Sequence, residues 1–251
     1  MNDIKHKQYL PGYIHKFKED TRWKTLETEH YVFNFFPNSV AEKEIKNIAE
    51  RQEQAYQKII AFLEVPEPTQ KIIYYLYPDE QTKKELMGDD WYAQAIYAEN
   101  CIHVLYTEEI KPIGEHEDTH LLSLPWGPSF ALFQEGLAEY LVGHNWYGED
   151  HPKRVRESWA KGLKLSPSEL MDQDSWLNIP DEMALFSYCV VGSFTAFLIE
   201  KYGKGKFKEL YQKTSRDNSA EENKQIFKDI YGLEISEVDE NWKKEILQYI
   251  F

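Results

Sequence analysis

The first half of the chain alternates between strand-like and helix-like hydrophobic patterns. The β-branched and aromatic residues 31–36 predict a strand, which the Pro37-Asn38-Ser39 break ends. Ser39 and Glu42 form a capping box ahead of apolar residues at helical spacing, so we expect a helix that ends before Pro66. Residues 71–77 are almost continuously apolar and predict a central strand, which a short helix follows from Pro78.

A predicted hairpin completes this first region. Residues 95–98 and 101–106 flank the pair Glu99-Asn100, a pattern typical of two antiparallel strands at a sheet edge. If residues 101–106 are the edge strand, an extended peptide can pair with them by strand addition. Residues 1–20 show no clear period and predict an irregular or partly helical lead-in. Residues 21–108 therefore predict a small mixed sheet with helices on it.

The pattern becomes helical from about Glu109 and stays so to the end of the chain. The helix that carries His116 and His120 is stopped by a Pro- and Gly-containing reversal at residues 125–128, and a second helix runs from about residue 129 to 142. Ser166 and Pro167 predict a further helix start, residues 183–202 a long apolar helix, and Ser219 and Ser236 two more starts. We expect an α+β protein in which residues 109–251 form a helical lobe, packed with the first as one unit.

The composition narrows the classes of function. Hydrophobic residues make up 42% and aromatic residues 15% of the 251 residues, as in folded globular proteins. A net charge of −14 argues against nucleic acid or anionic membrane as the main partner, because both attract positive surfaces. Cys101 and Cys189 are too few for a disulfide framework and are predicted to be buried thiols. No signal-peptide core or run of eighteen apolar residues is visible, so we expect a cytoplasmic protein unless an export signal was removed.

The strongest candidate for a functional motif is the stretch His116-Glu117-Asp118-Thr119-His120. On a helix the two histidines leave the same face and can close on one zinc ion, with Glu117 beside them to take a proton from water. Glu117 cannot act as a base and also be a ligand, so the third ligand must come from elsewhere. The alternative is a solvated helix face with surface histidines. Against it stands the next helix, which offers two acidic side chains one turn apart, Glu135 and Glu139.

Three motifs together resemble a known family. They are His116–His120, the stretch Phe-Gln-Glu-Gly-Leu-Ala-Glu-Tyr at residues 133–140, and Tyr188-x-x-x-Gly192-Ser-Phe leading to residues 200–203. Over residues 114–203 the chain resembles the gluzincin metallopeptidases, particularly the compact peptidase-MA-like proteins and, more distantly, the thermolysin and zinc aminopeptidase families. The resemblance implies a thermolysin-like helical lobe, with Glu135 as the third zinc ligand and Glu139 as hydrogen-bond acceptor for a ligand histidine. The longer spacing of the aminopeptidases would instead place the ligand at Glu139.

The resemblance also concerns residues outside the metal ligands. It implies that Tyr188 donates a hydrogen bond to the developing oxyanion, although Tyr188 shares a helical stripe with apolar residues and is equally compatible with a core role. Glu99-Asn100 matches only part of the motif with which zinc aminopeptidases hold a substrate amino terminus, so aminopeptidase specificity is not expected. Three further histidines are expected to be surface or packing residues rather than catalytic ones: His103, His144 and His151. His144 and His151 closely follow the helix of Glu135, so either could line the cleft, but no spacing rule singles them out.

The sequence therefore predicts a zinc metallopeptidase. One Zn²⁺ per chain would be held by His116, His120 and Glu135, with Glu117 as general base. The expected partner is a peptide or protein substrate, and neither nucleic acid nor membrane is expected as a partner. The alternative is a non-catalytic peptide- or protein-binding module on the same fold, with zinc structural or absent. The intact Glu117 favours the enzyme, because a structural site has no use for a base beside an open position.

Overall fold

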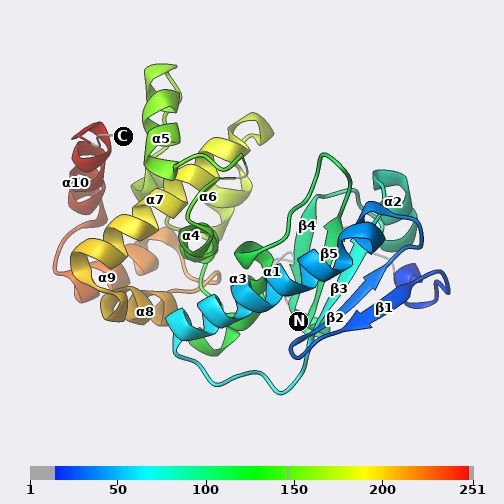
Figure 1. Ribbon diagram of the computed structural model, residues 1–251. Helices are drawn as coiled ribbons and strands as arrows, with labels where there is room; N and C mark the ends of the chain where they lie inside the picture. Colours follow the sequence, from blue (N-terminus) through cyan, green and yellow to red (C-terminus); the bar gives the residue numbers. More distant parts are fainter. Residues whose placement is uncertain (1–14, 146, 249–251) are drawn as a thin grey trace. The chain divides into compact units, whose positions relative to one another are not determined.

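The computed structural model describes residues 15–145 and 147–248 and shows an α+β protein with its sheet in the amino-terminal half (Figure 1). This confirms the predicted fold class. The chain divides into two compact units, Met1–Ser123 and Leu124–Phe251. The helix that carries His116 and His120 thus belongs to the sheet unit, whereas the sequence pattern had grouped it with the later helices. Most of the predicted lead-in lies outside the described residues, and its described part contains the short 3-10 helix η2, Lys16–Lys18.

The described residues form one five-stranded mixed sheet in the order β1-β2-β3-β5-β4. The two outer pairs are antiparallel, and β3 is parallel to both of its neighbours. The central position predicted for residues 71–77 is therefore confirmed. The strands are β1 (Lys24–Glu27), β2 (Tyr31–Phe35), β3 (Ile72–Tyr77), β4 (Ala93–Ile96) and β5 (Cys101–Leu105).

The predicted hairpin exists, but its second strand is not at the edge. β4 and β5 are antiparallel neighbours, joined through the 3-10 helix η3 (Tyr97–Glu99) and Asn100 in the left-handed conformation. β5 also pairs with β3, so both of its backbone edges are used and the outer strand is β4. The prediction that residues 101–106 accept a peptide by strand addition is therefore wrong, because a strand paired on both sides has no free backbone groups to offer.

Alternating side chains give the sheet two buried faces. Tyr31, Phe33 and Tyr74 pack on one face beneath α1 (Val40–Leu63), which begins at the predicted cap, Ser39 (Figure 1). The opposite face carries Tyr77 and Cys101 in a cluster that Phe17 from η2 and Met87 from α2 (Glu80–Met87) complete. Because both faces are covered, β3 is apolar nearly throughout, as its sequence indicated.

The segment between the sheet and the histidine helix is not helical, contrary to the pattern from Glu109 onward. α3 spans Glu115–Leu122 and starts only after Gly114, whose φ is 125°. A left-handed backbone at Gly114 cannot continue a right-handed helix, and Pro112 disfavours the helical conformation of the residue before it. The 3-10 helix η4 (Leu124–Trp126) and Gly127, whose φ is 108°, then form the predicted reversal.

The second unit is built around α7 (Ala184–Tyr202). This helix packs against α4, α5 and α8, and it is buried on most of its circumference. Among the described residues, only the stretch Asp181–Tyr202 has the length and apolar composition of a membrane span, and 67% of its apolar window is buried as in a core helix. The other helices of this unit are α4 (Ala131–Val142), α5 (His151–Ala160), α6 (Gln173–Leu177), α8 (Lys204–Lys213), α9 (Ala220–Tyr231) and α10 (Ile235–Gln248).

The predicted helix start at Ser166 produces only a single turn. Ser166 and Glu169 form the expected capping box, but the 3-10 helix η5 (Pro167–Glu169) is only three residues long, and the next residue, Leu170, is buried in the core. The hydroxyl groups of Ser166 and Ser168 both donate to the buried carboxylate of Asp239 on α10. This tertiary contact fixes the turn and explains why the local signal did not extend into an α-helix.

Candidate metal centre

The first element of the site is α3, which is short and is held by its neighbours. Its amino-terminal residue has no side-chain cap, because the preceding position is Gly114. Three acidic residues occupy the first turn, where the helix dipole favours negative charge: Glu115, Glu117 and Asp118. Glu115 also forms an ion pair of 2.8 Å with Lys58 on α1.

The second element is α4, and two glycines set its distance from α7. A Cβ atom added to Gly136 would lie 2.2 Å from Thr195 Oγ1 and 2.9 Å from the carbonyl oxygen of Val191. A Cβ atom added to Gly192 on α7 would lie 2.7 Å from Glu139 Cβ. These distances are below any ordinary contact, so both helices need glycine where they touch. The glycine that follows Glu135 in the sequence thus has a packing reason.

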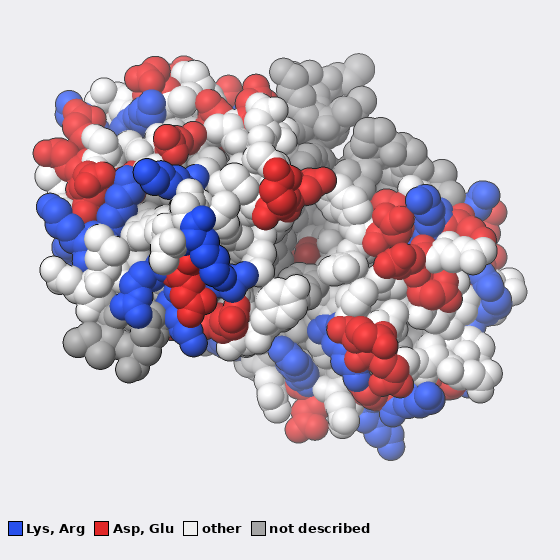
Figure 2. All heavy atoms as spheres, turned by 90° about the horizontal axis from the view of Figure 1, so that it is seen from above, with Lys and Arg blue, Asp and Glu red and all other residues white. Residues whose placement is uncertain are grey.

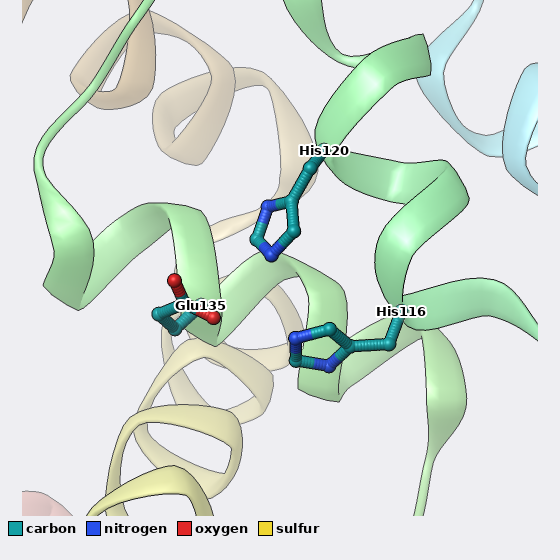
Figure 3. A group of neighbouring side chains, drawn as sticks. All are labelled: His116, His120 and Glu135. Carbon is teal, nitrogen blue, oxygen red and sulfur yellow. The ribbon is translucent and has the colours of Figure 1, made fainter. Parts of the chain in front are cut away.

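The structure brings His116, His120 and Glu135 together (Figure 3). Each offers one ligand atom, and these atoms all lie within 4.8 Å of one another. The two imidazole rings of α3 point toward the Glu135 carboxylate on α4, with ring centroids 5.0 Å apart and planes at 85°. His120 is buried, whereas His116 and Glu135 are partly exposed.

This donor set fits a zinc ion. Zinc binds imidazole nitrogen and carboxylate oxygen at about 2.0–2.2 Å, so atoms that share one ion lie at most about 4.4 Å apart. A group within 4.8 Å reaches that spacing by small side-chain rotations. Two imidazoles and one carboxylate are also the donors of catalytic zinc sites, which use three protein ligands and leave a fourth position for water. The residues present therefore suit zinc in number, type and spacing.

Of the two competing carboxylates, Glu135 is the one in this group. Glu139 is absent from the group of metal-ligand side chains found among the described residues. Its Oε2 atom instead shares a hydrogen bond of 2.8 Å with Nε2 of His151, at the start of α5. Both residues are buried, with relative exposures of 7% and 5%. His151 was predicted to be a surface or packing residue, and its burial against the helix of Glu135 is a feature that no spacing rule indicates.

Asp118 anchors α3 to the sheet. Its fully buried carboxylate accepts hydrogen bonds from the Tyr31 hydroxyl at 2.5 Å, the Tyr74 hydroxyl at 2.7 Å and Gln52 Nε2 at 2.9 Å. Burial raises the pKa of Asp118 to about 7, against the opposing effect of the two tyrosine hydrogen bonds. The sequence gives no local signal for this cluster, because its members come from β2, β3 and α1.

The remaining candidate residues lie as follows. Glu117 is half-buried on α3, three residues before His120 and therefore beside it on the helix. Tyr188 is half-buried on α7, with its ring edge-on to Trp176 at 5.3 Å. His103 is buried in β5, where its ring stacks on Tyr75, and its pKa lies well below the ordinary value because of burial. His144 is exposed, and both cysteines are buried and free as expected.

The surface charge gives no sign of a polyanion site on the face in Figure 2. The Lys and Arg side chains of the described residues on that face lie in small groups beside Asp and Glu. The whole chain carries 43 acidic and 29 basic residues. A polyphosphate backbone is bound through continuous positive surface, which this face does not present.

No protein-family model matches the chain, and no curated protein matches it by sequence.

Proposed function

We propose that this protein is a zinc-dependent hydrolase of peptide bonds. The observation that carries the proposal is the group of His116, His120 and Glu135, whose ligand atoms lie within 4.8 Å of one another. Glu117, adjacent in sequence to one ligand and three residues from the other, supplies the general base. When bound, a zinc ion would supply Lewis acidity to polarise the scissile carbonyl and acidify a neighbouring water.

The protein's own side chains perform the proton transfers in this proposal. The Glu117 carboxylate accepts a proton from the attacking water at one of its oxygens and later gives it to the nitrogen of the leaving amine. Its place on α3 favours this role, because residues three apart on a helix are neighbours and Glu117 is therefore next to His120. Tyr188 stays a candidate donor to the oxyanion; its half-buried hydroxyl-bearing ring is compatible with that role.

The substrate class follows from the reaction and from the charge of the chain. A peptide or protein is the proposed substrate, and the net charge of −14 favours neutral or basic peptides over acidic ones. The same charge disfavours nucleic acid and anionic membrane as partners. A cytoplasmic location is part of the proposal as the default for this composition.

The replacement Glu117→Gln tests the catalytic role. It keeps the size of the side chain but removes the base, so one zinc ion per chain should remain while cleavage of a peptide library falls by a factor of about 100 or more. Zinc content is measured by elemental analysis and cleavage by mass spectrometry on the same preparation.

The matched control is Glu115→Gln, which alters a neighbouring glutamate of α3 that pairs with Lys58. Glu115→Gln should retain both zinc and cleavage. Equal cleavage by the wild type and Glu117→Gln would refute the assigned base. A wild type that binds zinc but cleaves no peptide in the library would favour the non-catalytic binding module instead.

A further inference from the structure

The helix that carries both histidines is too short to hold its own position. α3 has eight residues, and isolated helices below about 12–15 residues are marginal in water. Its first turn also lacks a side-chain cap, since Gly114 precedes it. The orientation of α3, and with it the direction of both imidazoles, therefore depends on contacts with other elements.

The ion pair of Glu115 with Lys58 is at the surface, whereas the buried hydrogen bonds described between α3 and the sheet or α1 converge on Asp118. The two tyrosine hydroxyls reach it from adjacent strands, Tyr31 at Oδ2 and Tyr74 at Oδ1, so each carboxylate oxygen has a donor from the sheet. Gln52 Nε2 lies within hydrogen-bonding distance of Asp118 Oδ2 and also, at 3.1 Å, of the carbonyl oxygen of Gly114. One glutamine of α1 thus reaches both the first turn of α3 and the residue before it.

The anchor is on the opposite side of the helix from the ligands. Asp118 is two residues from His116 and two from His120, and two residues correspond to about 200° of helix rotation. A carboxylate held at both oxygens resists rotation of α3 about its axis in a way that apolar packing alone does not, because hydrogen bonds are directional. Fixing Asp118 therefore fixes the direction in which the two imidazoles leave the opposite face.

We propose that Asp118, with Tyr31, Tyr74 and Gln52, is a positioning network that sets the affinity of the centre for zinc. The inference rests on the proposed function only in taking the ion bound by His116 and His120 to be zinc. A ligand pair that is already oriented before the ion arrives loses less conformational freedom on binding, and so binds more tightly. Loosening the network should weaken zinc binding even where the protein remains folded.

Two tyrosines on β3 provide a matched test. Tyr74 and Tyr77 have exposures of 1% and 0%, and each hydroxyl makes a buried hydrogen bond, to Asp118 at 2.7 Å and to His103 Nδ1 at 2.8 Å. Only the Tyr74 bond reaches α3. The dissociation constant for zinc is measured on the full chain by competition with a chromophoric chelator, well below the melting temperature of each variant.

Tyr74→Phe should weaken zinc binding about fivefold, the equivalent of one net hydrogen bond, and Tyr77→Phe should leave it within about twofold of wild type. Tyr31→Phe removes the other phenol bond and should act like Tyr74→Phe, which covers the case in which one variant does not fold. Equal zinc affinities of Tyr74→Phe and Tyr77→Phe, or a zinc affinity of Tyr31→Phe equal to that of the wild type, would overturn the positioning role of the Asp118 network. A wild type that binds no zinc would overturn the proposed centre as well, whereas zinc binding without peptide cleavage would leave this inference standing and refute only the hydrolase.

Discussion

The close packing of α4 against α7 can be tested by adding a single methyl group at Gly192. In Gly192→Ala the new Cβ would lie 2.7 Å from Glu139 Cβ and 3.0 Å from Nδ1 of His151. Carbon atoms in ordinary contact are about 3.5–4.0 Å apart, so the two helices must separate by about 1 Å. Overpacking of this kind costs about 1–3 kcal/mol, and the better helix propensity of alanine offsets about 1 kcal/mol of it.

We therefore expect Gly192→Ala to lower the free energy of unfolding by about 1 kcal/mol, and by at most about 2 kcal/mol, measured by urea denaturation. The control is Gly205→Ala on α8, where an added Cβ has no neighbour within 4 Å and the substitution should be neutral or stabilising. Because Glu135 is one turn from Glu139 on α4, Gly192→Ala should also weaken zinc binding, and Gly205→Ala should not. A Gly192→Ala protein as stable as the wild type would refute the packing argument.

Two further predictions concern buried polar groups of the sheet unit. Burial holds the pKa of the Tyr74 hydroxyl well above its ordinary value of 10.0. The protonated hydroxyl therefore makes its full contribution to the free energy of unfolding below pH 10, and this contribution is lost as the pH rises further. Tyr74→Phe should accordingly flatten the fall of unfolding free energy above pH 10 by about 1.4 kcal/mol per pH unit in urea titrations, and parallel curves would contradict this. Lys83 is fully buried and donates to Asp89, so Lys83→Met should destabilise the protein by about 3 kcal/mol in the same assay, because it leaves the buried carboxylate of Asp89 without its cation. Most of that loss should return in Lys83→Met/Asp89→Asn, and a double variant as unstable as the single one would show that the ion pair is not the cause.

Local signals in the sequence were sufficient for most elements that carry their own pattern. Ser39 caps α1 as predicted, the apolar run of β3 lies at the centre of the sheet, and Ser219 with Glu222 opens α9 through a capping box. In each case the information lies within a few residues, where capping and burial patterns operate. The fold class could therefore be predicted from sequence alone.

The sequence-based predictions fail where contacts between distant parts of the chain determine the local structure. β1 is a short, largely exposed edge strand with little apolar pattern, and the position of β5 inside the sheet depends on pairing with β3, far away in sequence. The turn at Ser166 stays short because Asp239 on α10 holds it. Local propensity contains none of this information.

The same distinction between local sequence signals and tertiary contacts applies to the candidate site. The spacing of His116 and His120 placed them on one helix face, and the motif around Glu135 named the carboxylate that the structure brings to them. The supporting residues could not be found in this way. In the sequence, Asp118 is one of the unspecified positions between the two histidines, and its role becomes visible only from its hydrogen bonds with Tyr31 and Tyr74 in the fold. The role of His151 is likewise visible only from its hydrogen bond with Glu139.

The central claim is the zinc centre, and a zinc titration of three proteins tests it most directly. Isothermal titration calorimetry should give one zinc ion per chain for the wild type, and binding at least about 100-fold weaker for Glu135→Gln, which lacks one of three ligands. Glu139→Gln should keep a stoichiometry of one, because its carboxylate bonds to His151 and is not in the ligand group. Loss of the site in Glu139→Gln with retention in Glu135→Gln, or a wild type that takes up no zinc, would contradict the account.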